Sequence, residues 1–236
     1  MDTHLHHRHQ ESHLTSSQAL TDIVIGMSDG LTVPFALAAG LSGASGVSSG
    51  IIVIAGIAEI CAGSIAMGLG GYLAGKTEQD HYKSEQRREY DEVENLRHVE
   101  IEETKEFFAN IGLSPALQQQ ATDEIAQDKD RWVDFMMKYE LGMEKPDPKR
   151  ATKSALNIGL SYIAGGIIPL SPYFFITNAT EALKVSVVAT LLCLFVFGFF
   201  KSKITGVNPL WGAFRVTLIG AMAAAAAFGV AKLFEH

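Results

Sequence analysis

Five long apolar segments dominate the chain and predict five membrane-spanning helices. Each approaches or exceeds the roughly 20 residues that a helix needs to cross a bilayer. Small residues four positions apart, such as Gly26 and Gly30, recur in the first two segments, and this spacing lets helix backbones approach closely within one chain or between chains. The apolar segments lie near residues 21–42, 50–75, 153–171, 182–200 and 208–232.

A strongly charged segment separates the second apolar stretch from the third. Between Lys76 and Lys153 lie 19 of the 26 acidic residues and 13 of the 19 basic ones. A soluble protein spreads its charge over its whole surface, so the apolar remainder is expected to face lipid. Within the charged segment we expect three helices: an extension of the second span to Asn110, a helix opening at Ser114-Pro115, and one ending near Glu140.

The distribution of Lys and Arg predicts the orientation in the membrane. The turn at 42–49 and the loop at 171–181 contain neither residue type. The charged segment contains both, and the loop at 201–207 contains Lys201 and Lys203. Because basic loops stay on the cytosolic side, the N-terminus and the charged domain are expected in the cytosol and the C-terminus on the far side of the membrane.

The expected domain organisation follows from these boundaries. Five of the eight histidines precede residue 21, where we expect a disordered tail, with weak metal capture as the alternative. The four regions are a tail at 1–20, two spans at 21–75, a cytosolic helical domain at 76–150 and three spans at 151–236. The fold class is therefore an all-α integral membrane protein with five transmembrane helices per subunit plus a cytosolic three-helix domain.

Two carboxylates fall near the middle of predicted spans. Asp29 lies in the first and Glu59 in the second, where an ionised carboxylate costs several kcal/mol unless it faces a cavity, a partner or a cation. Pro34 frees the backbone carbonyl of Gly30 beside Asp29, and Met67 adds a soft ligand two turns from Glu59. These residues predict a path for a transition-metal ion; the alternative is two helices joined by a protonated carboxyl group.

The charged segment carries a second set of candidate ligands. Glu89, Glu92, Glu100 and Glu103 fall within an 80° arc on one helix, a stripe too long for a single ion unless the helix breaks near Asn95. Facing glutamates are how helical bundles hold divalent metals, although a solvated acidic face is the ordinary explanation of such a stripe. The complementary set on the last helix of the segment comprises Met136, Met137 and Glu140.

Two stretches of the chain resemble the vacuolar iron transporter family: DIVIGMSDGLTVPFAL from Asp22 to Leu37, and AEICAGSIAMG from Ala58 to Gly68. The resemblance implies a homodimer that moves cytosolic Fe²⁺ into the vacuole in exchange for protons. It implies a translocation path between the first spans of two subunits, with Asp29, Glu59 and Met67 on it. It further implies cytosolic metal ligands at Glu89, Glu92, Glu100, Glu103, Met136, Met137 and Glu140.

The expected activity is therefore transport rather than catalysis, with Fe²⁺ as cargo, no prosthetic group and no nucleic-acid partner. Mn²⁺, Co²⁺ and Zn²⁺ stay open as further cargo. One alternative is a membrane-anchored ferritin-like oxidase, but a di-iron bundle of that kind needs two Glu-x-x-His pairs, and Asn95 rather than Glu stands three residues before His98. The other alternative is an interaction scaffold, which would leave Asp29 and Glu59 without a role.

Overall fold

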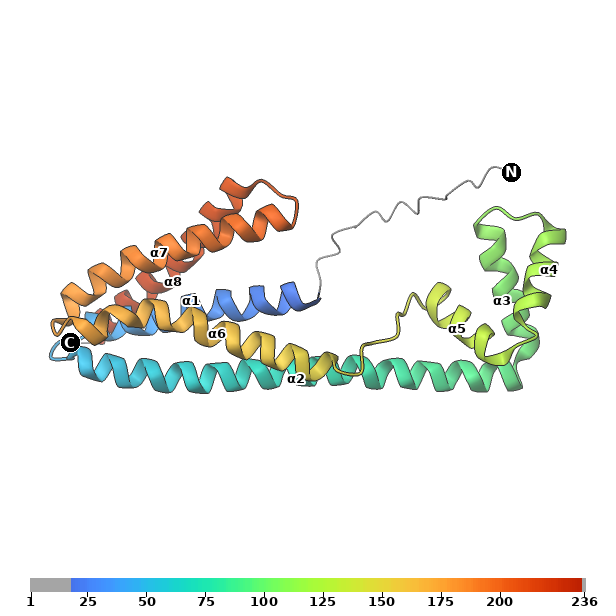
Figure 1. The fold of residues 1–236 in the computed structure, drawn as a ribbon, viewed down its shortest axis with the longest axis horizontal. Helices are drawn as coiled ribbons and strands as arrows, with labels where there is room; N and C mark the ends of the chain where they lie inside the picture. The colour runs from blue at the N-terminus through green and yellow to red at the C-terminus, as the bar shows by residue number, and fades with distance from the viewer. Residues whose placement is uncertain (1–17, 235–236) are drawn as a thin grey trace, which may run out of the picture. The chain divides into compact units, whose positions relative to one another are not determined.

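The computed structural model describes residues 18–234, and over that range its regular secondary structure is all α-helix. Five of its eight helices are long and apolar enough to cross a membrane, which confirms the five predicted spans (Figure 1). The five histidines of the predicted tail lie outside the described residues. The spanning helices are α1 (Gln18–Gly43), α2 (Ser49–Asn95), α6 (Arg150–Phe175), α7 (Ala179–Ile204) and α8 (Pro209–Leu233).

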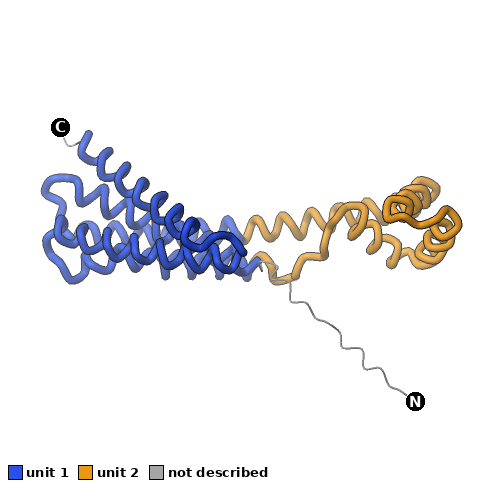
Figure 2. Tube along the Cα trace, turned by 90° about the horizontal axis from the view of Figure 1, so that it is seen from above, with its two compact units in different colours: residues 1–71, 153–236 blue, residues 72–152 orange. Residues whose placement is uncertain are grey.

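The chain forms two compact units (Figure 2). Unit 1 takes the chain up to Gly71 and again from Lys153, and unit 2 takes residues 72–152. Within unit 1, Gly26 and Gly30 lie directly against the backbone of α6, so a Cβ atom at either position would collide with a carbonyl oxygen of Ile158 or Tyr162. The predicted small-residue spacing therefore serves packing inside one chain.

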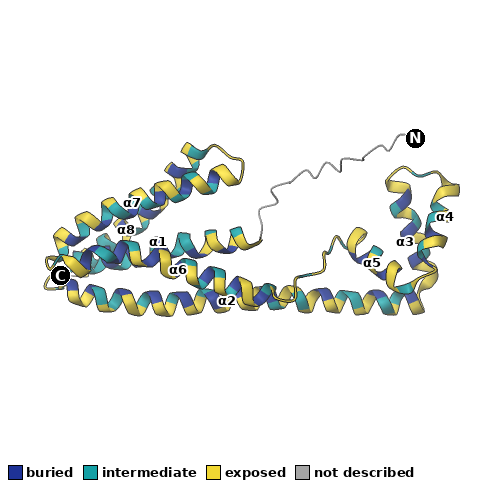
Figure 3. Ribbon diagram, in the orientation of Figure 1, coloured by how far each residue is buried: buried dark blue, intermediate teal, exposed yellow. Residues whose placement is uncertain are grey.

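Exposed residues run along the helices of unit 1 (Figure 3), and many of them are large and apolar. Val188 and Leu192 on α7 are 60% and 61% exposed, and Leu210 on α8 is 65% exposed. A protein in water would bury such side chains, whereas a lipid environment covers them without cost. The exposed apolar surface of these helices therefore agrees with a bilayer as their solvent.

The prediction that one helix runs unbroken to Asn110 is wrong. Helix α2 ends at Asn95, Leu96 leaves the helical conformation with φ −122° and ψ 28°, and α3 (Arg97–Asn110) begins directly afterwards. Neither Gly nor Pro marks this break, so tertiary packing rather than backbone propensity sets it. Gly112, at φ +91°, then reverses the chain in the left-handed conformation that favours glycine.

Unit 2 contains four helical segments instead of the three expected: the end of α2, then α3, α4 (Pro115–Ile125) and α5 (Lys129–Tyr139). As predicted, α4 opens with Pro115 at its first position, although the Ser114 side chain makes no capping hydrogen bond. Helix α5 is capped by Asp128, whose carboxylate accepts from the Arg131 amide. The unit therefore has one more helix end, created by the break at Leu96.

A buried tryptophan organises the core of unit 2. Trp132 is fully buried, and its indole Nε1 donates to the Thr104 hydroxyl at 2.8 Å. That hydroxyl lies 2.7 Å from the Glu100 carbonyl oxygen and 3.4 Å from the Met136 sulfur. This network joins α3 to α5 and fixes the first turns of α3, where the candidate metal ligands lie.

Candidate metal sites

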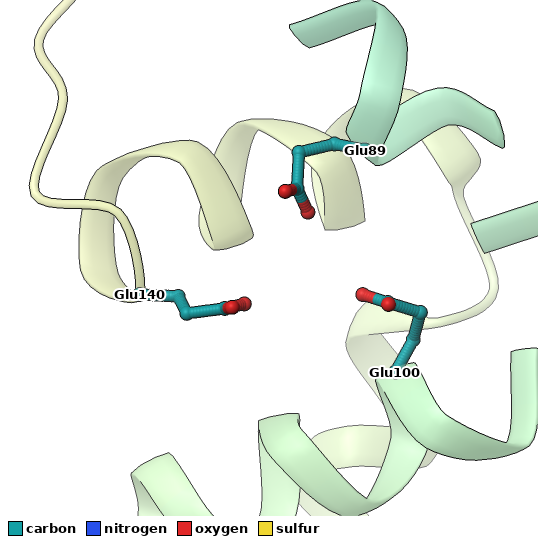
Figure 4. Close-up of side chains that lie close together, drawn as sticks. All are labelled: Glu89, Glu100 and Glu140. Atoms are coloured by element: carbon teal, nitrogen blue, oxygen red, sulfur yellow. The ribbon is translucent and has the colours of Figure 1, made fainter. Parts of the chain in front are cut away.

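Three glutamates of unit 2 converge on one point, and we call them the carboxylate cluster: Glu89, Glu100 and Glu140. They come from α2, α3 and the residue that ends α5, and their carboxylates point toward a common space (Figure 4). The break at Leu96 makes this possible, because it folds α3 back so that Glu100 faces Glu89. On a straight helix, 11 residues would separate the two by about 16 Å.

The spacing of the carboxylate cluster suits a metal ion. One oxygen from each glutamate lies within 4.8 Å of the other two. Three atoms so arranged share a point no more than about 2.8 Å from each, whereas carboxylate oxygens bind a first-row metal at about 2.0–2.2 Å. Side-chain movements of less than about 1 Å would therefore complete three ligand bonds to a single ion.

Two members of the carboxylate cluster, Glu89 and Glu100, are buried, whereas Glu140 is exposed. Glu89 and Glu100 are 1% and 3% exposed, and each has a buried Oε2 without a hydrogen-bond partner among the described residues. Burial first, and then the neighbouring carboxylates, raise the pKa of each to about 7. Burial and nearby charges also raise the pKa of Glu140. Buried acids with unpaired oxygens are typical of sites that a cation completes.

Two more of the predicted ligands lie close to the carboxylate cluster. Glu92 and Glu103 are near enough for their charges to contribute to the raised pKa values of the cluster. Arg88 is the basic group beside them, 3.6 Å from the Glu92 carboxylate and 3.9 Å from that of Glu89. The sequence pattern did not identify Arg88, which partly offsets the negative charge.

The two predicted methionine ligands are both 1% exposed and pack in the apolar core with Trp132. Met136 also lines a cavity of about 370 Å³ together with Glu103 and Glu140, and its sulfur lies 3.4 Å from the Thr104 hydroxyl. The same cavity is lined by Glu106, Asn110 and Tyr139, which the sequence analysis missed. Glu106 continues the three-residue spacing of Glu100 and Glu103, a signal that could have found it.

The membrane carboxylates have a partner that the sequence did not suggest. The Tyr162 hydroxyl on α6 donates to Glu59 Oε1 in a short hydrogen bond, while Glu59 Oε2 is buried without a partner among the described residues. Asp29 is half-buried on α1, within electrostatic range of the same hydroxyl. One side of Glu59 is therefore held in place, and the other is left open for a cation or a proton.

Pro34 lies in α1 and Met67 in α2, the helices that correspond to the first and second predicted spans. Met67 is half-buried on α2, two turns from Glu59, and Pro34 is buried inside α1, one turn from Asp29. Nearer the start of α1, Asp22 is 2% exposed and accepts a hydrogen bond from Ser154 at 3.0 Å. Asp22 therefore joins α1 to α6, and it is a third carboxylate on this face of the bundle.

Comparison with known proteins identifies the group to which this arrangement belongs. A model of the VIT family matches residues 20–232, which include every candidate ligand described above. The chain belongs to the VIT family. Vacuolar iron transporter 1 of Tulipa gesneriana is 51% identical over 227 residues, covering 96% of this chain and 92% of that protein.

Other VIT relatives extend the similarity across kingdoms. Vacuolar iron transporter 1 of Arabidopsis thaliana is 51% identical over 228 residues, covering 97% of this chain and 91% of that protein. Protein CCC1 of Saccharomyces cerevisiae is 36% identical over 230 residues, covering 92% of this chain and 69% of that protein. The similarity therefore spans both units, the membrane helices and the charged segment alike.

Proposed function

We propose that this chain transports ferrous iron from the cytosol into the vacuole in exchange for protons. The observation that carries the proposal is the carboxyl group of Glu59, held by Tyr162 within the spans of a VIT-family protein and left with one unpartnered oxygen. Such a group can bind a cation or a proton but not both, which is the basic requirement of an exchanger. The names of the relatives are those of transporters rather than enzymes.

The first step is capture of the ion by unit 2. The carboxylate cluster and the adjoining Glu92 and Glu103 concentrate negative charge around buried oxygens, which raises the local concentration of cations. Met136 lines the adjoining cavity and is the candidate sulfur ligand. Oxygen and sulfur ligands together favour a borderline ion such as Fe²⁺ over Mg²⁺ or Ca²⁺, and the same ligands would accept Mn²⁺, Co²⁺ or Zn²⁺.

Translocation then depends on the membrane carboxylates. The ion passes Met67 and reaches Asp29 and Glu59, which release protons when they bind it. Protonation from an acidic lumen displaces the ion and resets the carboxyl groups. We place the path between the first spans of two subunits, so that a homodimer supplies two copies of Asp29. The exposed apolar face of unit 1 is then the surface that the homodimer presents to lipid.

The orientation of the protein sets the direction of transport. Lys201 and Lys203 in the last turn of α7 keep that end in the cytosol, together with unit 2 and the N-terminus. The C-terminus then faces the lumen of the vacuole. Capture by unit 2 therefore occurs on the cytosolic side, and release occurs on the acidic side.

A single substitution tests the proposal. Glu59→Gln keeps the size and the acceptor for Tyr162 but removes the charge, so the protein should fold while Fe²⁺ uptake into proteoliposomes falls to background. The matched control is Glu181→Gln, an exposed carboxylate paired with Lys184 at the start of α7. Unchanged, proton-coupled uptake by the Glu59 variant would remove that residue from the mechanism.

A further inference from the structure

The ends of α7 and α8 enclose a basic cavity that the transport mechanism does not use. Its volume is about 470 Å³, and its wall includes the charged side chains of Lys201 and Arg215. Polar groups from Ser202, Thr205 and Asn208 complete it. We call this cavity the basic pocket.

The positive charge of the basic pocket has no counterpart in the helices that form it. From Ala182 to Phe234 the sequence contains no Asp or Glu at all, so neither α7 beyond its first turn nor α8 offers a carboxylate to Lys201 or Arg215. An anion that enters the basic pocket therefore meets two cations and no competing carboxylate from these two helices.

Close helix packing gives the basic pocket its shape. Gly198 of α7 lies against the backbone of Ala213, and Gly212 of α8 lies against the Ser202 side chain. A larger residue at either glycine would push the helices apart at the pocket. Asn208 caps α8 by accepting from the amides of Leu210 and Trp211, which fixes the turn that closes the pocket.

The rim of the basic pocket carries an exposed tryptophan, which indicates a place near the lipid headgroups. Trp211 lines the pocket, is 66% exposed and stacks on Phe214 at 6.0 Å, and tryptophan on a spanning helix concentrates at the membrane–water interface. Ile219, one turn beyond Arg215, is 50% exposed on the apolar side. The pocket thus offers cations to a headgroup and an apolar edge to acyl chains.

We infer that the basic pocket binds the phosphate headgroup of an anionic membrane lipid, with Lys201 and Arg215 as its ligands. The apolar, exposed rim favours a lipid over a soluble phosphate, because a free anion gains nothing from that surface. The inference is independent of iron transport, since none of the pocket residues belongs to the proposed path. Loss of lipid binding at this pocket would leave the transport proposal intact, and loss of transport would leave the lipid site intact.

Native mass spectrometry of the full-length protein in detergent tests this inference, with dioleoyl phosphatidylinositol 4-phosphate as the probe and phosphatidylcholine as the reference lipid. We expect preferential retention of the phosphoinositide. Lys201→Gln and Arg215→Gln should each weaken its binding about fivefold, the usual effect of one basic residue near an anionic headgroup. Lys203→Gln is the matched control, because this lysine has the same charge and lies two residues away but does not line the pocket.

Each alternative outcome overturns the inference. An equal loss in Lys203→Gln would mean diffuse attraction rather than a site, and no loss in Lys201→Gln would remove the pocket from lipid binding. Displacement of the lipid by equimolar free inositol 1,4-bisphosphate would make soluble phosphate the ligand. If Arg215→Gln does not elute as folded protein, the half-buried Lys201 decides the question alone.

Discussion

The substitution Glu100→Gln should stabilise the metal-free protein while removing metal binding. Glu100 is 3% exposed, and burial together with Glu103 and Glu89 raises its pKa from 4.5 to about 7. A rise of that size makes ionisation harder by about 3 kcal/mol. Because the neighbouring Glu140 is exposed to solvent, which screens part of this charge, we expect the neutral glutamine to raise the free energy of unfolding by about 1–2 kcal/mol at pH 8.

The pH dependence of this gain follows from the direction of the shift. A carboxyl group whose pKa is raised in the folded state takes up a proton on folding between pH 4.5 and 7. The metal-free protein therefore loses stability as the pH rises through this window, and keeps that stability at lower pH. The advantage of Glu100→Gln should be largest at pH 8 and should shrink toward zero near pH 4.

Intrinsic fluorescence offers a suitable assay, because the chain has two tryptophans and only Trp132 lies in unit 2. In a Trp211→Phe background, the fluorescence of Trp132 follows the thermal unfolding of unit 2 in the full-length protein. A gain of about 1–2 kcal/mol in the free energy of unfolding should raise the Tm of this unit by about 5–10 °C. Glu102→Gln is the control, since its side chain is 72% exposed and pairs with Lys105 on the same helix. A lower Tm for Glu100→Gln than for this control at pH 8 would refute the reasoning.

The remaining predictions concern the path, the pH response and the choice of metal. Tyr162→Phe should lower Fe²⁺ uptake about tenfold, the loss of one hydrogen bond to a charged group. The control Tyr173→Phe, on the same helix α6, loses a hydrogen bond to Ser42 of α1 and should leave uptake unchanged. Co²⁺ affinity by calorimetry should fall at least about tenfold between pH 7.5 and 6, because Glu89 and Glu100 must lose protons to bind; a flat profile would contradict this. Met136→Leu conserves volume, so it should keep the fold yet weaken Co²⁺ about fivefold more than Mn²⁺; equal losses would exclude a sulfur ligand.

The membrane part of the fold could be predicted well because its signal is simple. Apolar length alone located all five spans, and the predicted starts and ends differ from those of the helices by a few residues where the chain leaves the membrane. The continuation of α2 into the charged segment was also visible, since no Gly or Pro follows Gly75 closely. What the pattern could not supply was the partner of each intramembrane carboxylate, because Tyr162 is an ordinary aromatic residue in an apolar helix.

The carboxylate cluster illustrates the limit of helical periodicity. Helical periodicity places Glu89 and Glu100 on one acidic stripe of a single continuous helix. It indicates a break near Asn95 only as an alternative, namely if the stripe is to bind a single ion. The structure contains that break at Leu96, and its cause lies in contacts distant in sequence, such as the Trp132 to Thr104 hydrogen bond. Local spacing found the right residue types, but only tertiary packing brought three of them within reach of one ion.

The central claim, exchange of iron for protons, is tested most directly in proteoliposomes with an acidic lumen. Fe²⁺ uptake and lumenal pH are followed together by a lumenal metal indicator and a pH-sensitive dye, with Glu59→Gln vesicles as the blank. We predict Fe²⁺ entry accompanied by lumenal alkalinisation, with both signals lost when the pH gradient is collapsed and in the blank. Iron entry at the same rate with and without the gradient, and no change in lumenal pH, would contradict the account.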